Sequence, residues 1–95
     1  MLSPGRQYQY KVLSKVLTAA RADPGVAEGL LKKINTITIL DLGGGALDLK
    51  LNANTNDTIT CSNGLKIEGI PITDIWWINA AQPGLTATIF VAWVD

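Results

Sequence analysis

The chain has 95 residues, of which 47% are hydrophobic and only 17% are charged, and its mean hydropathy is +0.22. A chain of this length builds one hydrophobic core, and its charged share lies below the roughly 25% of typical soluble domains, so apolar surface is left over for contacts. The absence of histidine removes the commonest general base and transition-metal ligand, and the single cysteine, Cys61, excludes an internal disulfide or a CxxC pair.

The charges are distributed unevenly along the chain. Residues 1–34 carry six basic and two acidic side chains, whereas residues 35–95 carry two basic and six acidic ones. The two segments are therefore electrostatically complementary and are expected to attract each other within or between subunits. The longest basic run is Lys32-Lys33, so nucleic-acid binding is not expected.

Residues 1–34 are predicted to form an amphipathic helical arm. Ser3 and Pro4 supply a helix cap and a first-turn proline. Apolar residues then recur at helical spacing, namely Tyr8, Val12, Leu13, Val16, Leu17 and Ala20. Asp23 and Pro24 repeat the signal and predict a second, shorter helix. We expect the arm to pack on its own β domain or on a neighbouring copy; a membrane-surface helix would need larger apolar anchors.

Residues 35–95 are predicted to form a mainly β domain, a small six-stranded antiparallel sandwich or barrel. Turn residues separate short β-rich stretches, which we assign as strands at 36–42, 47–51, 58–61, 65–68, 72–79 and 85–94. The Asn-Gly pair of Ser62-Asn63-Gly64 predicts a tight hairpin between its flanking strands. A bulge or bend is predicted at Gly69.

Residues 75–94 carry no charge over 20 positions, which is enough to span a bilayer. Asn79, Gln82, Pro83 and Gly84 interrupt the stretch, so we predict two strands and no membrane span. The first residues lack the pattern of a secretory signal, and we expect the protein to be made and kept, or assembled, in the cytosol.

Two segments have part of the pattern of known sites. Residues 39–48 contain Asp-Leu-Gly-Gly-Gly and resemble the phosphate-binding hairpin of the actin, sugar-kinase and heat-shock ATPase superfamily. However, Ala46 replaces the hydroxyl-bearing residue, and 95 residues cannot build that two-domain fold. Residues 52–57 alternate oxygen ligands as in a calcium loop but include only one carboxylate, Asp57, so tight calcium binding is not expected.

Catalytic chemistry is not predicted either. Asp41 and Asp48 flank the glycine turn, but a core this small leaves hardly any room for a substrate cleft between them. Cys61 has no basic neighbour in sequence, so an inert buried thiol is expected. The sequence therefore predicts a protein that is not an enzyme and that has no cofactor and no metal.

Aromatic residues near the C-terminus indicate an interface. Trp76 and Trp77 are adjacent and point to opposite faces of a strand, so at most one of them enters the core. Both faces of the last strand are apolar, which indicates burial between subunits; cover by the N-terminal helix alone is the alternative. The predicted oligomer interface consists of Trp76, Trp77, Phe90, Trp93, Val12 and Val16.

The closing segment, residues 72–93 (ITDIWWINAAQPGLTATIFVAW), resembles the terminal hairpin of small bacteriophage virion proteins, in which an apolar strand, an Asn-x-Ala-Gln-x-Gly type turn and a Thr-rich strand end a β-sandwich. The resemblance implies a capsid-associated structural protein, such as a decoration, cement, spike-base or head-to-tail component. It would be synthesised in the host cytoplasm and displayed in the virion as a homo-oligomer, a trimer or larger ring, beside other virion proteins. The alternative is a carbohydrate- or ligand-binding β-sandwich that uses Trp76 or Trp77 as a stacking platform.

Overall fold

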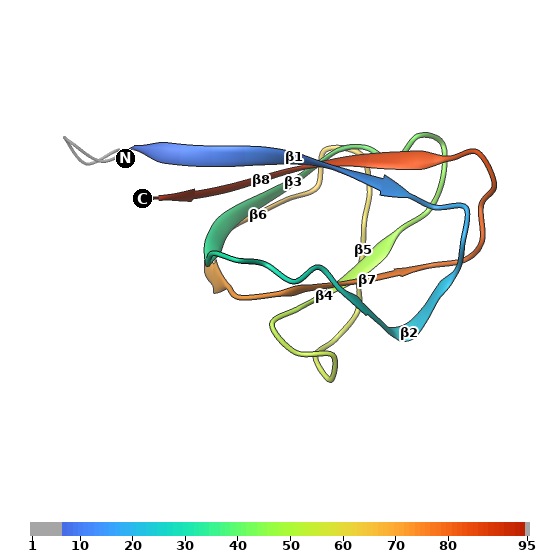
Figure 1. The fold of residues 1–95 in the computed structure, drawn as a ribbon, viewed down its shortest axis with the longest axis horizontal. Coiled ribbons are helices and arrows are strands. Elements are labelled where there is room, and N and C mark those ends of the chain that lie inside the picture. Colours follow the sequence, from blue (N-terminus) through green and yellow to red (C-terminus); the bar gives the residue numbers. More distant parts are fainter. Residues whose placement is uncertain (1–6, 95) are drawn as a thin grey trace.

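The computed structural model describes residues 7–94 and consists of two four-stranded antiparallel sheets packed face to face (Figure 1). The strands are, in chain order, β1 Tyr8–Val16, β2 Arg21–Ala27, β3 Ile34–Asp41, β4 Asp48–Leu51, β5 Ile59–Thr60, β6 Lys66–Ile72, β7 Ile75–Asn79 and β8 Thr86–Val94. The first sheet has the order β1-β8-β3-β6 and the second has the order β2-β7-β4-β5. A mainly β fold is therefore confirmed.

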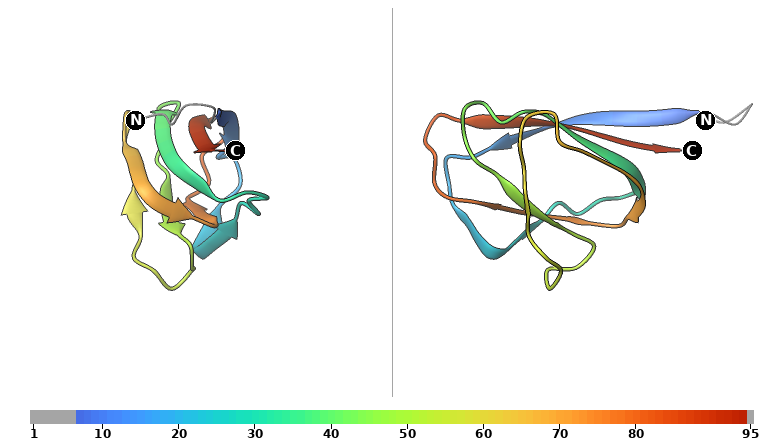
Figure 2. Two further views of the ribbon diagram at one scale, coloured as in Figure 1. Left: turned by 90° about the vertical axis from the view of Figure 1, so that its left-hand side faces the viewer. Right: turned by 180° about the vertical axis from the view of Figure 1, so that it is seen from behind.

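The chain crosses between the two sheets at nearly every connection (Figure 2). Only β4 and β5 follow each other in sequence and also pair with each other. This strand order is that of a jelly roll, the eight-stranded, two-sheet architecture made of two Greek keys. Apart from β4 and β5, strands that are neighbours in sequence therefore belong to different sheets and do not form hairpins.

The core lies between the sheets and is formed by alternate residues of the strands. In β8, the side chains of Ala87, Ile89 and Val91 point inward and are buried, as the sequence pattern predicts. Leu49 of β4 and Trp77 of β7 meet them from the second sheet, and both are fully buried. Burying one such large side chain contributes roughly 1.5–3 kcal/mol, so this interior holds the two layers together.

The predicted N-terminal helix is wrong for the residues that the structure describes, because residues 8–27 form β1 and β2. The apolar spacing of β1 also fits a strand, with Tyr8, Tyr10, Val12 and Val16 on one side at a period of two. Pairing with β8 over the full length of β1 decides between the two patterns. The predicted cap at residues 3–4 lies outside the described residues.

The number of strands and the division of the chain also differ from the prediction. All six stretches assigned as strands contain a strand, β3 to β8, and β1 and β2 bring the total in the described residues to eight. Since β1 pairs with β8 and β2 pairs with β7, residues 8–27 contribute one strand to each sheet. The segment expected to be a separate arm, 1–34, is therefore part of the sandwich wherever the structure describes it.

Both predicted hairpins are corrected by the sheet topology. Ser62-Asn63-Gly64 does form a turn, closed by a 3.0 Å hydrogen bond from the N–H of Leu65 to the carbonyl of Ser62, but β5 and β6 on either side belong to different sheets. The same holds for β7 and β8 around the turn at 80–84. The residues of a turn determine where the chain reverses direction, whereas hydrogen bonding between distant segments determines which strands pair. The predicted irregularity at Gly69 is confirmed by a register shift between β3 and β6.

Candidate interaction surface

The outer side of the first sheet has an uncharged surface that spans three adjacent strands. The register places alternate residues of β1, β8 and β3 on this side. We call it the outer face, and its members are Tyr8, Tyr10, Val12, Ser14, Val16, Thr86, Thr88, Phe90, Ala92, Val94, Thr36, Thr38 and Leu40. Large apolar side chains here remain exposed, among them Tyr10 at 68% and Leu40 at 49%.

An aromatic pair lies at the centre of the outer face. The rings of Tyr10 and Phe90 stack with their centroids 5.5 Å apart and their planes at 6°. Beside them lies a depression of about 340 Å³, lined by residues of β1, β8, β3 and β6, with the small side chain of Ala92 buried in it. A ridge of stacked rings next to a shallow hollow is a shape that a partner surface can fit.

The charged groups on the outer side of this sheet, within the described residues, lie at its margins: Lys66 and Glu68 on β6, and Asp41 at the end of β3 opposite Thr88. Lys66 and Glu68 lie on β6 opposite Thr38 and Thr36, and they pair with each other at 3.5 Å. This exposed pair contributes little to stability and leaves the outer face neutral. An extended apolar surface with charge only at its rim has the composition of a protein–protein contact.

The structure brings together three of the six residues of the predicted interface. Val12, Val16 and Phe90 all lie on the outer face. Trp77 lies in the core at 1% exposure, so a single copy offers none of its surface to a partner. Tyr10 and Leu40 were not predicted from the sequence, although the period-two pattern of β1 could have indicated Tyr10.

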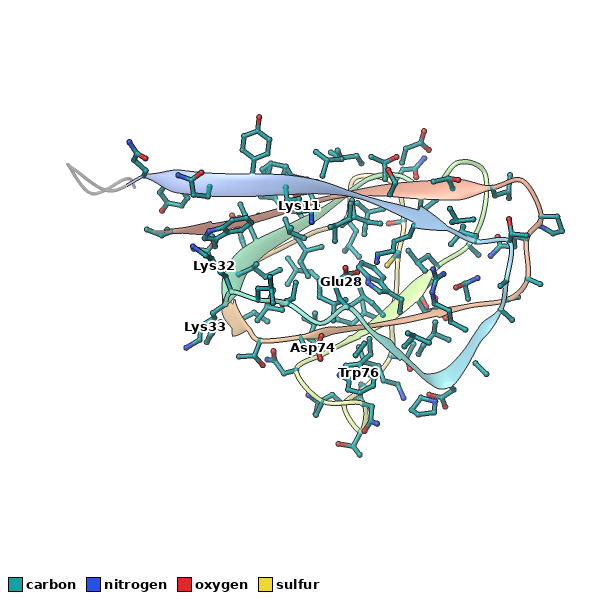
Figure 3. All side chains as sticks on the ribbon, viewed as in Figure 1. Lys11, Glu28, Lys32, Lys33, Asp74 and Trp76 are labelled. Atoms are coloured by element: carbon teal, nitrogen blue, oxygen red, sulfur yellow. The ribbon has the colours of Figure 1, made fainter. Side chains whose placement is uncertain are left out.

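Trp76 and Trp93 lie on other parts of the molecule. Trp76 points away from the core on the outer side of the second sheet, opposite Lys50 of β4 (Figure 3). The expectation that no more than one of the two adjacent tryptophans enters the core is confirmed. Trp93 lies on the inner side of β8 near its end, where the ammonium of Lys32 sits 6.0 Å from the centroid of its ring.

A groove of about 400 Å³ opens between the sheets beside Trp93. Its walls include the apolar side chains of Leu13, Leu30 and Val91. Its charged groups are Lys11, Glu28 and Lys32, which Figure 3 labels. Leu31, in the loop between β2 and β3, is fully exposed at its mouth. The groove is thus mostly apolar, with a few polar groups, as small-ligand sites are.

The glycine-rich turn after β3 is held by the protein's own side chains. The N–H of Leu42 donates to Asn63 Oδ1 at 2.8 Å, and the N–H of Gly43 donates to Asp41 Oδ1 at 2.8 Å. Gln82 accepts from the N–H of Ala46 at 2.7 Å and donates back to its carbonyl at 2.8 Å. These backbone donors are occupied within the chain, so the turn lacks the free N–H cradle of a phosphate loop.

Cys61 is buried at 6% exposure, and burial together with the nearby charge of Asp48 raises the pKa of its thiol to about 12. Among residues 7–94 no cluster of three or more potential metal ligands occurs, and no helix there is long and apolar enough to cross a membrane. The outer face therefore stands as the main candidate surface.

No protein-family profile matches the chain, and comparisons with curated proteins and with solved structures give no match.

Proposed function

We propose that this protein is a structural subunit that acts by assembling with copies of itself, as a capsid-associated component of a bacteriophage virion. The observation that carries the proposal is the outer face, an uncharged surface over β1, β8 and β3 with the stacked rings of Tyr10 and Phe90 at its centre. Large apolar surfaces on a soluble protein are normally covered by a partner. A neutral surface is compatible with a second copy of itself, since no like charges oppose each other.

The jelly-roll strand order supports the virion class. This architecture occurs in viral capsid domains, and also in lectins and cupins. The support is therefore an analogy at the level of the fold and carries no residue-level role. A small core stabilises a domain only modestly. Symmetric contacts between copies in a repetitive shell would add to the stability of a small jelly roll with an apolar outer sheet.

A ligand-binding sandwich is the second candidate, and the groove beside Trp93 is the observation that favours it. The stacking platform would then be Trp93, at the edge of the groove, in place of Trp76 or Trp77. Binding of small sugars or carboxylates by a monomer that stays monomeric at high concentration would favour this function over assembly.

Self-assembly is tested by measuring solution mass with light scattering over a wide dilution series. We expect a discrete oligomer for the natural protein and a smaller species for Phe90→Asp, because the variant loses the contacts made through the outer face. Leu40→Asp is a second variant, because Leu40 is half exposed in one copy and its replacement leaves the core intact. Leu31→Asp is the matched control, since it changes a fully exposed leucine outside the outer face. A natural protein that is monomeric throughout the series would overturn the proposal.

The virion assignment needs a separate measurement. Particles are purified on a density gradient from the culture in which the protein is naturally produced. They are then analysed by quantitative mass spectrometry. We expect peptides of this protein to co-migrate with the shell proteins in a fixed ratio. If the protein is found only in fractions without particles, the virion role is wrong even where self-assembly is observed.

A further inference from the structure

A sandwich of two open sheets has four edge strands, and three of them are interrupted. β6 contains Gly69 and Pro71 and has a register shift against β3. β2 contains Pro24 and has a register shift against β7, and β5 is only two residues long. Short length, proline and bulges are the devices that keep edge strands from pairing with other chains.

The fourth edge strand, β1, is long and regular. It runs over nine residues, contains neither glycine nor proline, and pairs with β8 in an unbroken register from Tyr8 to Val16. On its other side, no strand of residues 7–94 pairs with it. Together with β8 it extends beyond the other strands at one end of the molecule (Figure 1).

The hydrogen-bond ladder shows which backbone groups of β1 face the free edge. The N–H of Leu17 donates to the carbonyl of Leu85 at 2.9 Å, which continues the register of β1 and β8 by one residue. Bonded and unbonded pairs alternate in an antiparallel ladder, so Lys15, Leu13, Lys11 and Gln9 also bond to β8. The residues between them direct their N–H and C=O groups to the free edge; these are Tyr8, Tyr10, Val12, Ser14 and Val16.

We propose that two copies of this protein join through antiparallel pairing of their β1 strands, about a twofold axis at Val12. This register sets Val12 opposite Val12 of the second copy, Tyr10 opposite Ser14, and Tyr8 opposite Val16. Every free N–H and C=O group from Tyr8 to Val16 then finds a partner. The strand is thus complementary to itself over its whole length.

The lysines on the inner side of β1 disfavour the two neighbouring registers. An axis at Leu13 would place Lys11 directly opposite Lys15 of the second copy, and an axis at Lys11 would place that residue opposite itself. Like charges directly opposite each other destabilise a sheet. With the axis at Val12, Lys11 faces Leu13 and Lys15 faces Gln9. Within each copy Lys15 is already paired with Glu28.

This pairing extends the proposed function, and it rests on that function in one respect, namely that the outer face binds a further copy. Joining two β1 strands makes one eight-stranded sheet whose two outer faces are contiguous. The edge and the outer face are different surfaces, so a subunit that uses both can build an assembly larger than a dimer.

The experiment uses engineered cysteines in a Cys61→Ala background, followed by mild oxidation and non-reducing gel electrophoresis. Directly opposite residues of a bonded pair have Cα atoms about 5.5 Å apart, within disulfide range. We expect Val12→Cys to form a covalent dimer. Tyr8→Cys alone should remain monomeric on the gel, whereas an equimolar mixture of Tyr8→Cys and Val16→Cys should cross-link.

The outcomes separate this pairing from the outer face. Cross-linking of Val12→Cys and of the mixture, but not of Tyr8→Cys alone, supports the register. Equal cross-linking of all samples, or of none, overturns it. If Val12→Cys does not cross-link while the parent is oligomeric and Phe90→Asp is monomeric, the outer face stands and the edge pairing fails. If Val12→Cys cross-links while Phe90→Asp keeps the parental mass, the edge pairing stands and the outer face fails.

Discussion

The indole N–H of Trp77 donates a 2.7 Å hydrogen bond to Glu28 Oε1, in the space between the two sheets. Glu28 also pairs with Lys15 of β1, whose ammonium lies 5.7 Å from the centroid of the Trp77 ring. One carboxylate therefore connects β7 of the second sheet to β1 of the first. Because this contact is mostly shielded from water, each partner depends on the others for its hydrogen bonding.

Replacing Glu28 should lower the free energy of unfolding in a graded way. Glu28→Gln keeps an oxygen acceptor for Trp77 and loses the charge that pairs with Lys15. Glu28→Leu loses both and leaves two polar groups unsatisfied, for an expected cost of roughly 2–3 kcal/mol. Urea unfolding followed by tryptophan fluorescence, at one fixed protein concentration, measures the series. Equal stability of the two variants would mean that the hydrogen bond to Trp77 contributes nothing.

Gly43 and Gly44 form a matched pair for testing why the turn after β3 contains glycine. Both have positive φ, 66° and 83°, so alanine at either position costs about 1–2 kcal/mol of backbone strain. A Cβ on Gly43 would clash with the carbonyl oxygen of Thr86, whereas one on Gly44 would meet no atom within 4 Å. We expect Gly43→Ala to lower the melting temperature clearly more than Gly44→Ala. Similar losses would show that β8 moves aside freely.

The strands from residue 34 onward could be predicted because their side chains alternate in burial. Leu47, Leu49 and Leu51 are all buried, as the apolar pattern indicates. Lys50 was expected to face water but is buried as well, with its ammonium bonded to Asp23. Local patterns report which side of a strand faces the core. They do not report which strand lies beside it, and for this reason both predicted hairpins failed.

The N-terminal prediction failed because the apolar residues of β1 fit two periods. Val12 and Val16 lie four residues apart, on one face of a helix and equally on one face of a strand. The lysines of β1 lie on its inner side, where Lys15 meets Glu28 and Trp77. That ion pair joins β1 to the residue that follows β2, so no local pattern could have shown it.

The buried thiol of Cys61 makes stability depend on alkaline pH. Its pKa of about 12 in the folded protein lies above the value of about 8.5 for an unfolded chain, so between these values only the unfolded state loses the proton. Stability from this group is fully present below the unfolded value and is lost as pH rises, at up to about 1.4 kcal/mol per pH unit. Urea unfolding at several pH values should give a shallower alkaline decline for Cys61→Ala. Identical declines would contradict the prediction.

Self-association through the outer face should depend little on salt, because among the described residues the charged groups near that face, Asp41, Lys66 and Glu68, lie at its margins. The opposite charges of residues 1–34 and 35–95 offer the contrasting mechanism, which would weaken strongly as the Debye length falls to about 3 Å at 1 M ionic strength. Sedimentation velocity in rising sodium chloride should show an unchanged dissociation constant, and sodium sulfate should tighten it. The variant Leu40→Lys places like charges on the two surfaces that face each other. Its self-association should therefore be weak in low salt and partly restored in high salt, where the repulsion is screened. Loss of assembly of the natural protein in high salt would instead assign the contact to the charged segments.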